Sequence, residues 1–171
     1  MKVTLKIEGR TLDEVRRDLV RPHAFAHERV GFLTAGASAI GQELMLLVRD
    51  YRPVDDADYE HDPRVGAKIG SAAMRKAVQS AYRPPAVLLH VHTHGGLGRP
   101  GFSQVDLRSA DEFVPGFFET TPRMPHGLLV LSDNSACGLL WLAGARPPVD
   151  ITTFTRIDAP LQRAWGNHEL A

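Results

Sequence analysis

Apolar residues recur at nearly helical spacing in two segments of the chain. Between residues 11 and 26 they are Leu12, Val15, Leu19 and Val20. Thr11 can cap the start of this segment and Pro22 cannot continue a helix, so the pattern predicts a helix that ends near Pro22. Residues 65–83 carry a second apolar stripe, formed by Ile69, Ala73, Met74, Ala77 and Val78. This stripe predicts another helix, which the following Pro84 and Pro85 stop.

Short apolar runs bounded by turn residues predict the strands. Residues 28–36 form one such run, and residues 43–54 form a continuous run that indicates a strand buried on both faces. The turn-rich segment 36–42 between them predicts a hairpin. Residues 86–94 indicate a central strand, residues 126–144 a second hairpin that turns at 132–135, and residues 149–158 a final strand.

The order of these elements predicts the fold class. A third helix is expected over residues 105–114, after Ser103, and it should end at Pro115. Helices thus interleave with strands around a mainly β core, so we expect an α/β or α+β fold. A length of 171 residues fits one domain over residues 1–171.

Composition excludes several classes of protein. Twenty basic and twenty acidic side chains leave no net charge, which argues against a nucleic-acid-binding protein. The single cysteine, Cys137, rules out an internal disulfide framework and fits a reducing compartment. The first residues have no apolar signal segment, and the longest apolar runs are too short to cross a bilayer. We therefore expect a soluble, cytoplasmic protein without membrane contact.

The segment HVHTHGGLGRPGFSQVD, residues 90–106, concentrates the candidate chemistry. Alternate residues of a strand share a face, so His90, His92 and His94 should line one side, where two imidazoles could chelate a metal ion. The simpler interpretation is a group of histidines that only pack. Ser103 and Asp106 have the spacing of a helix capping box, which also leaves Asp106 close enough to be a third ligand.

Two histidines and one carboxylate would leave a fourth tetrahedral position to water, the open arrangement of a catalytic zinc site. Such a hydrolase also needs a proton acceptor from elsewhere in the chain. Glu28, at the head of ERVGFLTAG, is a suitable candidate, although an exposed charge at a strand start is the commoner case.

Together these residues resemble the zinc metalloprotease motif of the JAB/MPN (JAMM) family. The motif has a glutamate ahead of a G-[FL]-L-x-x-G strand, then H-[ST]-H, a loop and S-x-x-D, and the resemblance spans residues 28–141. It implies a mixed sheet flanked by helices with cytidine-deaminase-like layering. It also implies Zn²⁺ bound by His92, His94 and Asp106, with Glu28 as general base and acid and Ser103 stabilising the oxyanion.

The resemblance further implies a substrate class. Members with the full motif cleave the bond after the C-terminal glycine of ubiquitin or ubiquitin-like proteins, and others release amino acids from sulphur-carrier proteins. The compact chain is similar to stand-alone prokaryotic members. The implied partners are a ubiquitin-like protein or its conjugates and the activating and conjugating enzymes of the same system, and a homodimer is the default for a domain with strand edges.

The sequence departs from the family pattern in the loop between His94 and Ser103. That loop has eight residues, one more than in many members, and Gly95 stands where a proline often follows the second histidine. His90 and His92 are the alternative ligand pair. The rival functions are a non-catalytic MPN-type scaffold, a protein whose histidines only pack, and another H-x-H hydrolase, a phosphoesterase or amidohydrolase, with further ligands from His61, His126 or His168.

Overall fold

The computed structural model describes residues 1–143, 146–158 and 164–166. The helices are α1 (Gly9–Leu19), α2 (Ser71–Tyr82) and α3 (Gln104–Thr120), with a short 3₁₀ turn at Asp56–Asp58. The strands are β1 (Lys2–Glu8), β2 (Val30–Ile40), β3 (Glu43–Pro53), β4 (Val87–Thr93), β5 (His126–Leu131), β6 (Ala136–Trp141), β7 (Val149–Asp150), β8 (Thr153–Ile157) and β9 (Ala164–Gly166).

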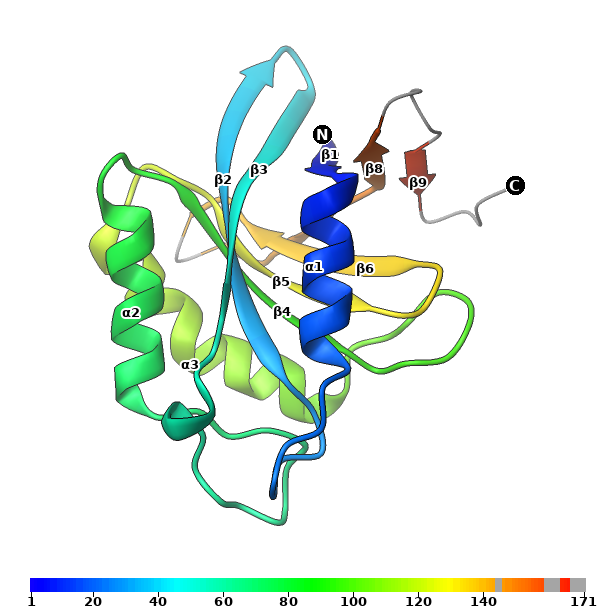
Figure 1. The fold of residues 1–171 in the computed structure, drawn as a ribbon. Helices are drawn as coiled ribbons and strands as arrows, with labels where there is room; N and C mark the ends of the chain where they lie inside the picture. Colours follow the sequence, from blue (N-terminus) through cyan, green and yellow to red (C-terminus); the bar gives the residue numbers. More distant parts are fainter. Residues whose placement is uncertain (144–145, 159–163, 167–171) are drawn as a thin grey trace.

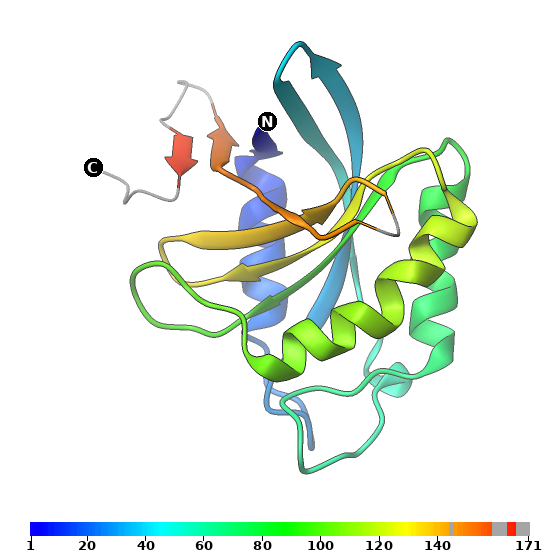
Figure 2. The same ribbon diagram turned by 180° about the vertical axis from the view of Figure 1, so that it is seen from behind.

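The described strands form one mixed sheet in the order β7-β6-β5-β4-β2-β3-β1-β8-β9. The sheet curls strongly (Figures 1 and 2). β7 and β8 follow each other along the chain, but β7 pairs with β6 near one end of the strand order and β8 pairs with β1 near the other end. The amide of Ile151 donates to the carbonyl of Gly138 on β6, and the next amide, that of Thr152, donates to Val3 on β1. Two consecutive residues therefore bridge strands that lie five positions apart in the sheet order.

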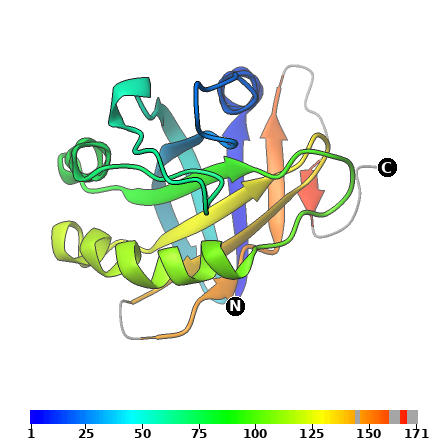
Figure 3. The same cartoon turned by 90° about the horizontal axis from the view of Figure 1, so that it is seen from below.

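Helices cover both faces of the sheet, so the chain has two apolar cores. On one face Leu12, Val15 and Leu19 of α1 pack against a cluster that includes Leu33, Leu46 and Leu129. On the other face α2 and α3 bury a second cluster, with members Ala77, Val114, Phe117, Phe32 and Leu88. Figure 3 shows α1 and α3 on opposite sides of the strands. A mixed α/β fold with a helix-flanked sheet, as expected, is confirmed.

Several boundaries differ from the expectation. The hairpin of β2 and β3 is confirmed, but its turn is confined to Gly41 and Gln42, where Gly41 has a φ of +59°. β3 alternates between buried and exposed residues, so the expectation of burial on both faces is wrong: Leu46 is buried whereas Leu47 is 49% exposed. α2 begins only at Ser71, because the preceding residues form a turn and bend at 63–66 and an isolated bridge between Ile69 and Tyr59.

α3 does not end at Pro115 but continues through it to Thr120. Pro115 lies on the exposed side of the helix, where the missing amide costs one hydrogen bond. Phe117 and Phe118 are buried just beyond it, and their burial stabilises the extra turn.

β1, near the N-terminus, and the short strand β9 were not anticipated. The alternation of Val3, Leu5 and Ile7, all buried, is the signal for β1. The single strand predicted over residues 149–158 is two strands, β7 and β8, since the chain passes from one side of the curled sheet to the other. Within the described residues, no helix combines the length and the apolar composition that a membrane crossing requires.

The side chain of His126, the first residue of β5, connects that strand to β4 and to the end of α3. Its Nδ1 accepts the amide proton of Leu88 at 3.1 Å, so the ring proton is on Nε2, which lies 3.1 Å from the carbonyl of Thr121. The side chain is fully buried. Burial lowers the pKa of His126 to about 4, so the folded protein holds this ring neutral.

The low pKa of His126 predicts a pH-dependent stability. Between pH 6.5 and about 4 the unfolded chain binds a proton here that the folded protein does not bind. The free energy of unfolding should therefore fall as the pH is lowered through this window, by about 1.4 kcal/mol per pH unit from this group. Urea unfolding of the protein and of His126→Gln should show profiles that converge toward low pH. Parallel profiles, or an imidazole that titrates near 6.5 by NMR, would contradict this assignment.

Candidate metal centre

The alternation of β4 places its histidines on one face, next to the sheet's second core. β4 pairs with β2 on one side and β5 on the other. The side chain of His92 is 2% exposed, and His94, just past the end of the strand, is 26% exposed. The Nε2 atoms of these two rings are 3.1 Å apart. The strand thus delivers one buried and one accessible imidazole to the same point.

The first turn of α3 brings a carboxylate to these two rings. Asp106 Oδ1 lies 3.3 Å from Nε2 of His92, and Oδ2 lies 3.4 Å from Nε2 of His94. A capping box holds Asp106 in place: its Oδ2 accepts the Ser103 amide proton at 2.7 Å, and its own amide donates to Ser103 Oγ at 3.2 Å. The capping and ligand interpretations of this pair are therefore compatible.

The three donor side chains are spaced like the ligands of a small divalent metal ion. Bonds of about 2.0–2.1 Å to nitrogen and oxygen place tetrahedral ligands about 3.3–3.4 Å apart. The two nitrogens are 3.1 Å apart, and each lies 3.3–3.4 Å from a different oxygen of the Asp106 carboxylate, so these pairwise separations are close to this spacing. Nε2 of His92 is the nitrogen that faces the other donors. Its Nδ1 is buried and has no hydrogen-bond partner among the described residues.

Glu28 faces the same histidines from the segment that leads into β2. The antiparallel register sets Val30 opposite His92, which carries the residue two positions earlier to the metal-facing end of β4. A carboxylate oxygen of Glu28 and ring nitrogens of His92 and His94 all lie within 4.8 Å of one another. Two carboxylates, those of Glu28 and Asp106, therefore face one pair of imidazoles.

All five predicted site residues line one cavity of about 430 Å³: Glu28, His92, His94, Ser103 and Asp106. Partial burial would by itself raise the pKa of Asp106. The hydrogen bond and charge of His92, together with the bonds from Ser103, outweigh burial and lower the pKa well below its usual range. Asp106 is therefore ionised, as a metal ligand must be.

His90 lies deeper in the same cavity wall. Its ring packs against those of Phe32 and Phe113, with centroids 5.4 and 5.1 Å away. Burial, followed by repulsion from His92, lowers the pKa of His90 to about 3. The contacts to Asp106 come from His92 and His94, which favours them over the alternative pair of His90 and His92.

The other histidines weighed as ligands lie elsewhere. The His61 ring packs against Phe25, with centroids 5.3 Å apart. His126 bonds Leu88 and Thr121, and His168 is outside the described residues. Sequence reasoning missed the segment 64–67, which also lines the cavity. Gly66 within it and Gly70 just after it were the available signal that it does not belong to α2.

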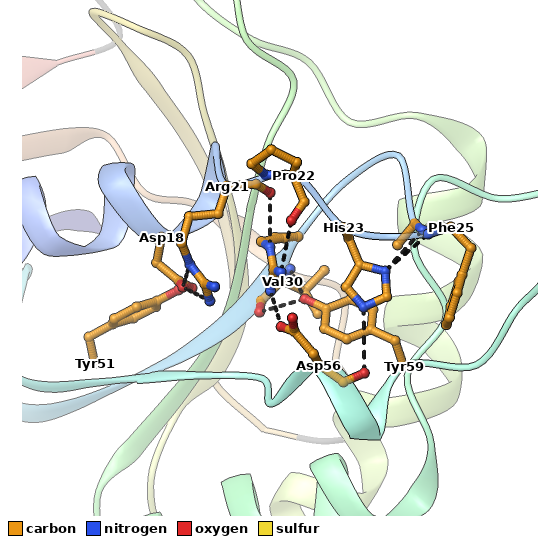
Figure 4. A network of polar contacts seen from close by, with 11 residues as sticks. Asp18, Arg21, Pro22, His23, Phe25, Val30, Tyr51, Asp56 and Tyr59 are labelled. Atoms are coloured by element: carbon orange, nitrogen blue, oxygen red, sulfur yellow. Dashed lines mark hydrogen bonds and ion pairs between the residues drawn. The ribbon is translucent and has the colours of Figure 1, made fainter.

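A buried arginine, Arg29, fixes the segment that carries Glu28, and Figure 4 labels its partners Arg21, Pro22 and Asp56. The Arg29 side chain is 2% exposed, donates to the carbonyls of Arg21 and Pro22 at 2.9 and 3.0 Å, and pairs with Asp56 at 2.7 Å. Tyr59 adds a bond, since its hydroxyl accepts the amide proton of Val30 at 2.9 Å. The loop before β2 is therefore held against the segment that follows β3.

Comparisons with known proteins assign no family. No family model and no curated protein matches the chain. Among solved structures, the chain is similar to the Trichoplax adhaerens STIL N-terminal domain, with a TM-score of 0.39 and 10% sequence identity. The match covers 81% of this chain and 41% of that one. A likeness at this level carries no argument about function.

The contacts of Arg29 predict a large loss of stability on their removal. Arg29→Met keeps most of the volume but leaves two carbonyls and Asp56 without their partner, so it should lower the free energy of unfolding by about 3 kcal/mol. Arg10→Met is the control, because the Arg10 side chain is 88% exposed. It should change stability by less than about 0.5 kcal/mol in the same urea unfolding experiment. Equal effects of the two substitutions would contradict the anchoring role.

Proposed function

We propose that this protein is a zinc-dependent peptidase of the JAB/MPN type. Its substrate would be the peptide or isopeptide bond after the C-terminal glycine of a ubiquitin-like protein. The observation that carries the proposal is the convergence of His92, His94 and Asp106 at 3.1–3.4 Å, with Glu28 facing the same two rings. The mixed sheet flanked by helices is compatible with MPN-like layering, which is part of the proposal.

The donor set favours zinc. Two imidazole nitrogens and one carboxylate oxygen are the usual three protein ligands of a catalytic zinc ion, and they leave one position open. Thiolate ligands of a closed structural site play no part, since Cys137 is a buried residue of β6 that is not among the cavity-lining residues. Zinc held here would supply Lewis acidity and make hydroxide available near neutral pH.

Glu28 is placed to move the proton. Its carboxylate lies beside the ligand nitrogens but outside the hydrogen-bonded set formed by Ser103 and Asp106. In the proposed reaction Glu28 takes a proton from the attacking water and passes it to the departing amine. The carboxylate is then free again for the next turnover.

Ser103 can stabilise the oxyanion while it caps α3. Its Oγ accepts the amide proton of Asp106, which leaves the hydroxyl hydrogen available to a group in the cavity. A single oxyanion donor of this kind typically contributes a factor of about a hundred to a thousand in kcat. The capping role and the catalytic role therefore use different parts of the same hydroxyl.

The rim of the site suits an extended tail of small residues. Gly95, Gly96 and Gly98 all have positive φ, and their loop is bonded to the β5–β6 turn: Asp133 donates to the Gly96 carbonyl and Gly98 donates to Asn134. At the three glycines no side chain separates the backbone from an extended peptide, and the exposed Leu97 of the same loop adds an apolar side chain beside them. The proposed partners are a ubiquitin-like protein or its conjugates and the activating and conjugating enzymes of that system. A sulphur-carrier protein joined to an amino acid is the alternative substrate.

Metal content and turnover test the proposal together. The protein freed of metal and then supplied with zinc should bind about one equivalent, whereas His92→Ala, His94→Ala and Asp106→Ala should lose it. Glu28→Ala should keep the zinc and lose cleavage of a ubiquitin-like protein with a peptide extension after its terminal glycine. Retained cleavage by Glu28→Ala would show that it is not the base. One zinc per chain without any cleavage would favour a scaffold.

The two roles of Ser103 predict separable effects. Ser103→Ala should lower kcat by about a hundred- to a thousandfold and stability by about 1 kcal/mol, because both the donor and the cap are lost. Ser103→Gly should lower kcat equally but cost only a few tenths of a kcal/mol, because glycine is tolerated as an N-cap. Thermal unfolding and steady-state kinetics measure the two effects. Unchanged kcat in both variants would remove Ser103 from the mechanism.

A further inference from the structure

The carboxylate of Glu28 occupies the space that any side chain at position 66 would need. A Cβ added at Gly66 would lie 2.5 Å from the Glu28 carboxyl carbon and 2.6 and 3.0 Å from its two oxygens. The backbone of Gly66 does not have the positive φ found at Gly95. The absence of a side chain, and not a special backbone conformation, is therefore what this position supplies.

The same residue also holds the backbone of Glu28. The carbonyl of Gly66 accepts the amide protons of His27 at 2.8 Å and of Glu28 at 3.0 Å. One residue thus fixes the main chain of Glu28 through its carbonyl and gives room to its carboxylate through its missing Cβ. Both features of Gly66, its carbonyl and its missing Cβ, therefore help to position Glu28, whose carboxylate faces His92 and His94.

The loop that contains Gly66 is closed by contacts between its two ends. The amide of Glu60 donates to the carbonyl of Lys68 at 2.9 Å, and their side chains form an ion pair at 3.2 Å. Tyr59 and Ile69 form an antiparallel bridge. These contacts join the two ends of the loop of residues 60–68, which contains Gly66. The fold therefore fixes the position of Gly66 beside Glu28.

We propose that Gly66 is a positioning residue that holds the Glu28 carboxylate at the metal-facing wall of the cavity. The inference rests on the proposed function, because it assumes that Glu28 moves the proton. A methyl group at position 66 displaces the carboxylate and leaves His92, His94 and Asp106 in place. Proton transfer then slows, whereas metal binding and substrate binding persist.

Gly66→Ala tests this role, with Gly116→Ala as the matched control. A Cβ at Gly116 in α3 meets nothing within 4 Å. Gly66→Ala should lower kcat by about ten- to a hundredfold, the scale expected for a reacting group misplaced by about 1 Å. KM and the zinc stoichiometry should not change, and Gly116→Ala should keep the parent kcat. An unaltered kcat in Gly66→Ala overturns the proposal, as does a loss of zinc.

A double-mutant cycle with Glu28→Ala separates this inference from the proposed function. Gly66→Ala should change the thermal midpoint less favourably when Glu28 is present than in Glu28→Ala, where the crowded carboxylate is gone. The cycle needs no substrate. An inactive parent protein would therefore contradict the proposed peptidase function without affecting the measured coupling between Gly66 and Glu28. The same loss of stability in both backgrounds, or failure of the double variant to fold, overturns the positioning role.

Discussion

The antiparallel pairing of β2 with β4 is the constraint on which the site depends. Because Val30 lies opposite His92, the residue that precedes β2 by two positions arrives beside the last histidines of β4. A shift of one residue would turn every β2 side chain to the other face of the sheet and carry Glu28 away with the strand. Buried residues on both faces, such as Phe32 and Leu33, prevent that shift, so the two cores also fix the chemistry.

Asp106 and Arg29, a carboxylate in the site and a guanidinium next to it, both have partners. Asp106 receives bonds from Ser103 and faces two imidazoles, and Arg29 behind Glu28 is compensated by Asp56 and by two carbonyls. A buried guanidinium without such partners would cost several kcal/mol. The supporting contacts lie in the loop before β2 and in the segment that follows β3. His94 is the more accessible of the two imidazoles that line the cavity.

Local patterns predicted the part of the site that lies within one segment. The spacing of His92 and His94 and the capping pair of Ser103 and Asp106 are geometric consequences of a strand and a helix start, so they could be read from the sequence. Gly66 could not be identified in this way, because its contact with Glu28 joins segments that only the tertiary fold brings together. The continuation of α3 through Pro115 could not be predicted for the same reason, because it depends on the burial of Phe117 against other parts of the fold.

X-ray absorption at the zinc K-edge tests the central claim most directly, using protein loaded with one equivalent of zinc. The account predicts four nitrogen or oxygen ligands at about 2.0–2.1 Å, with the outer-shell scattering of two imidazoles. Six oxygen ligands without imidazole scattering would contradict the account, because the ion would then not be held by His92 and His94.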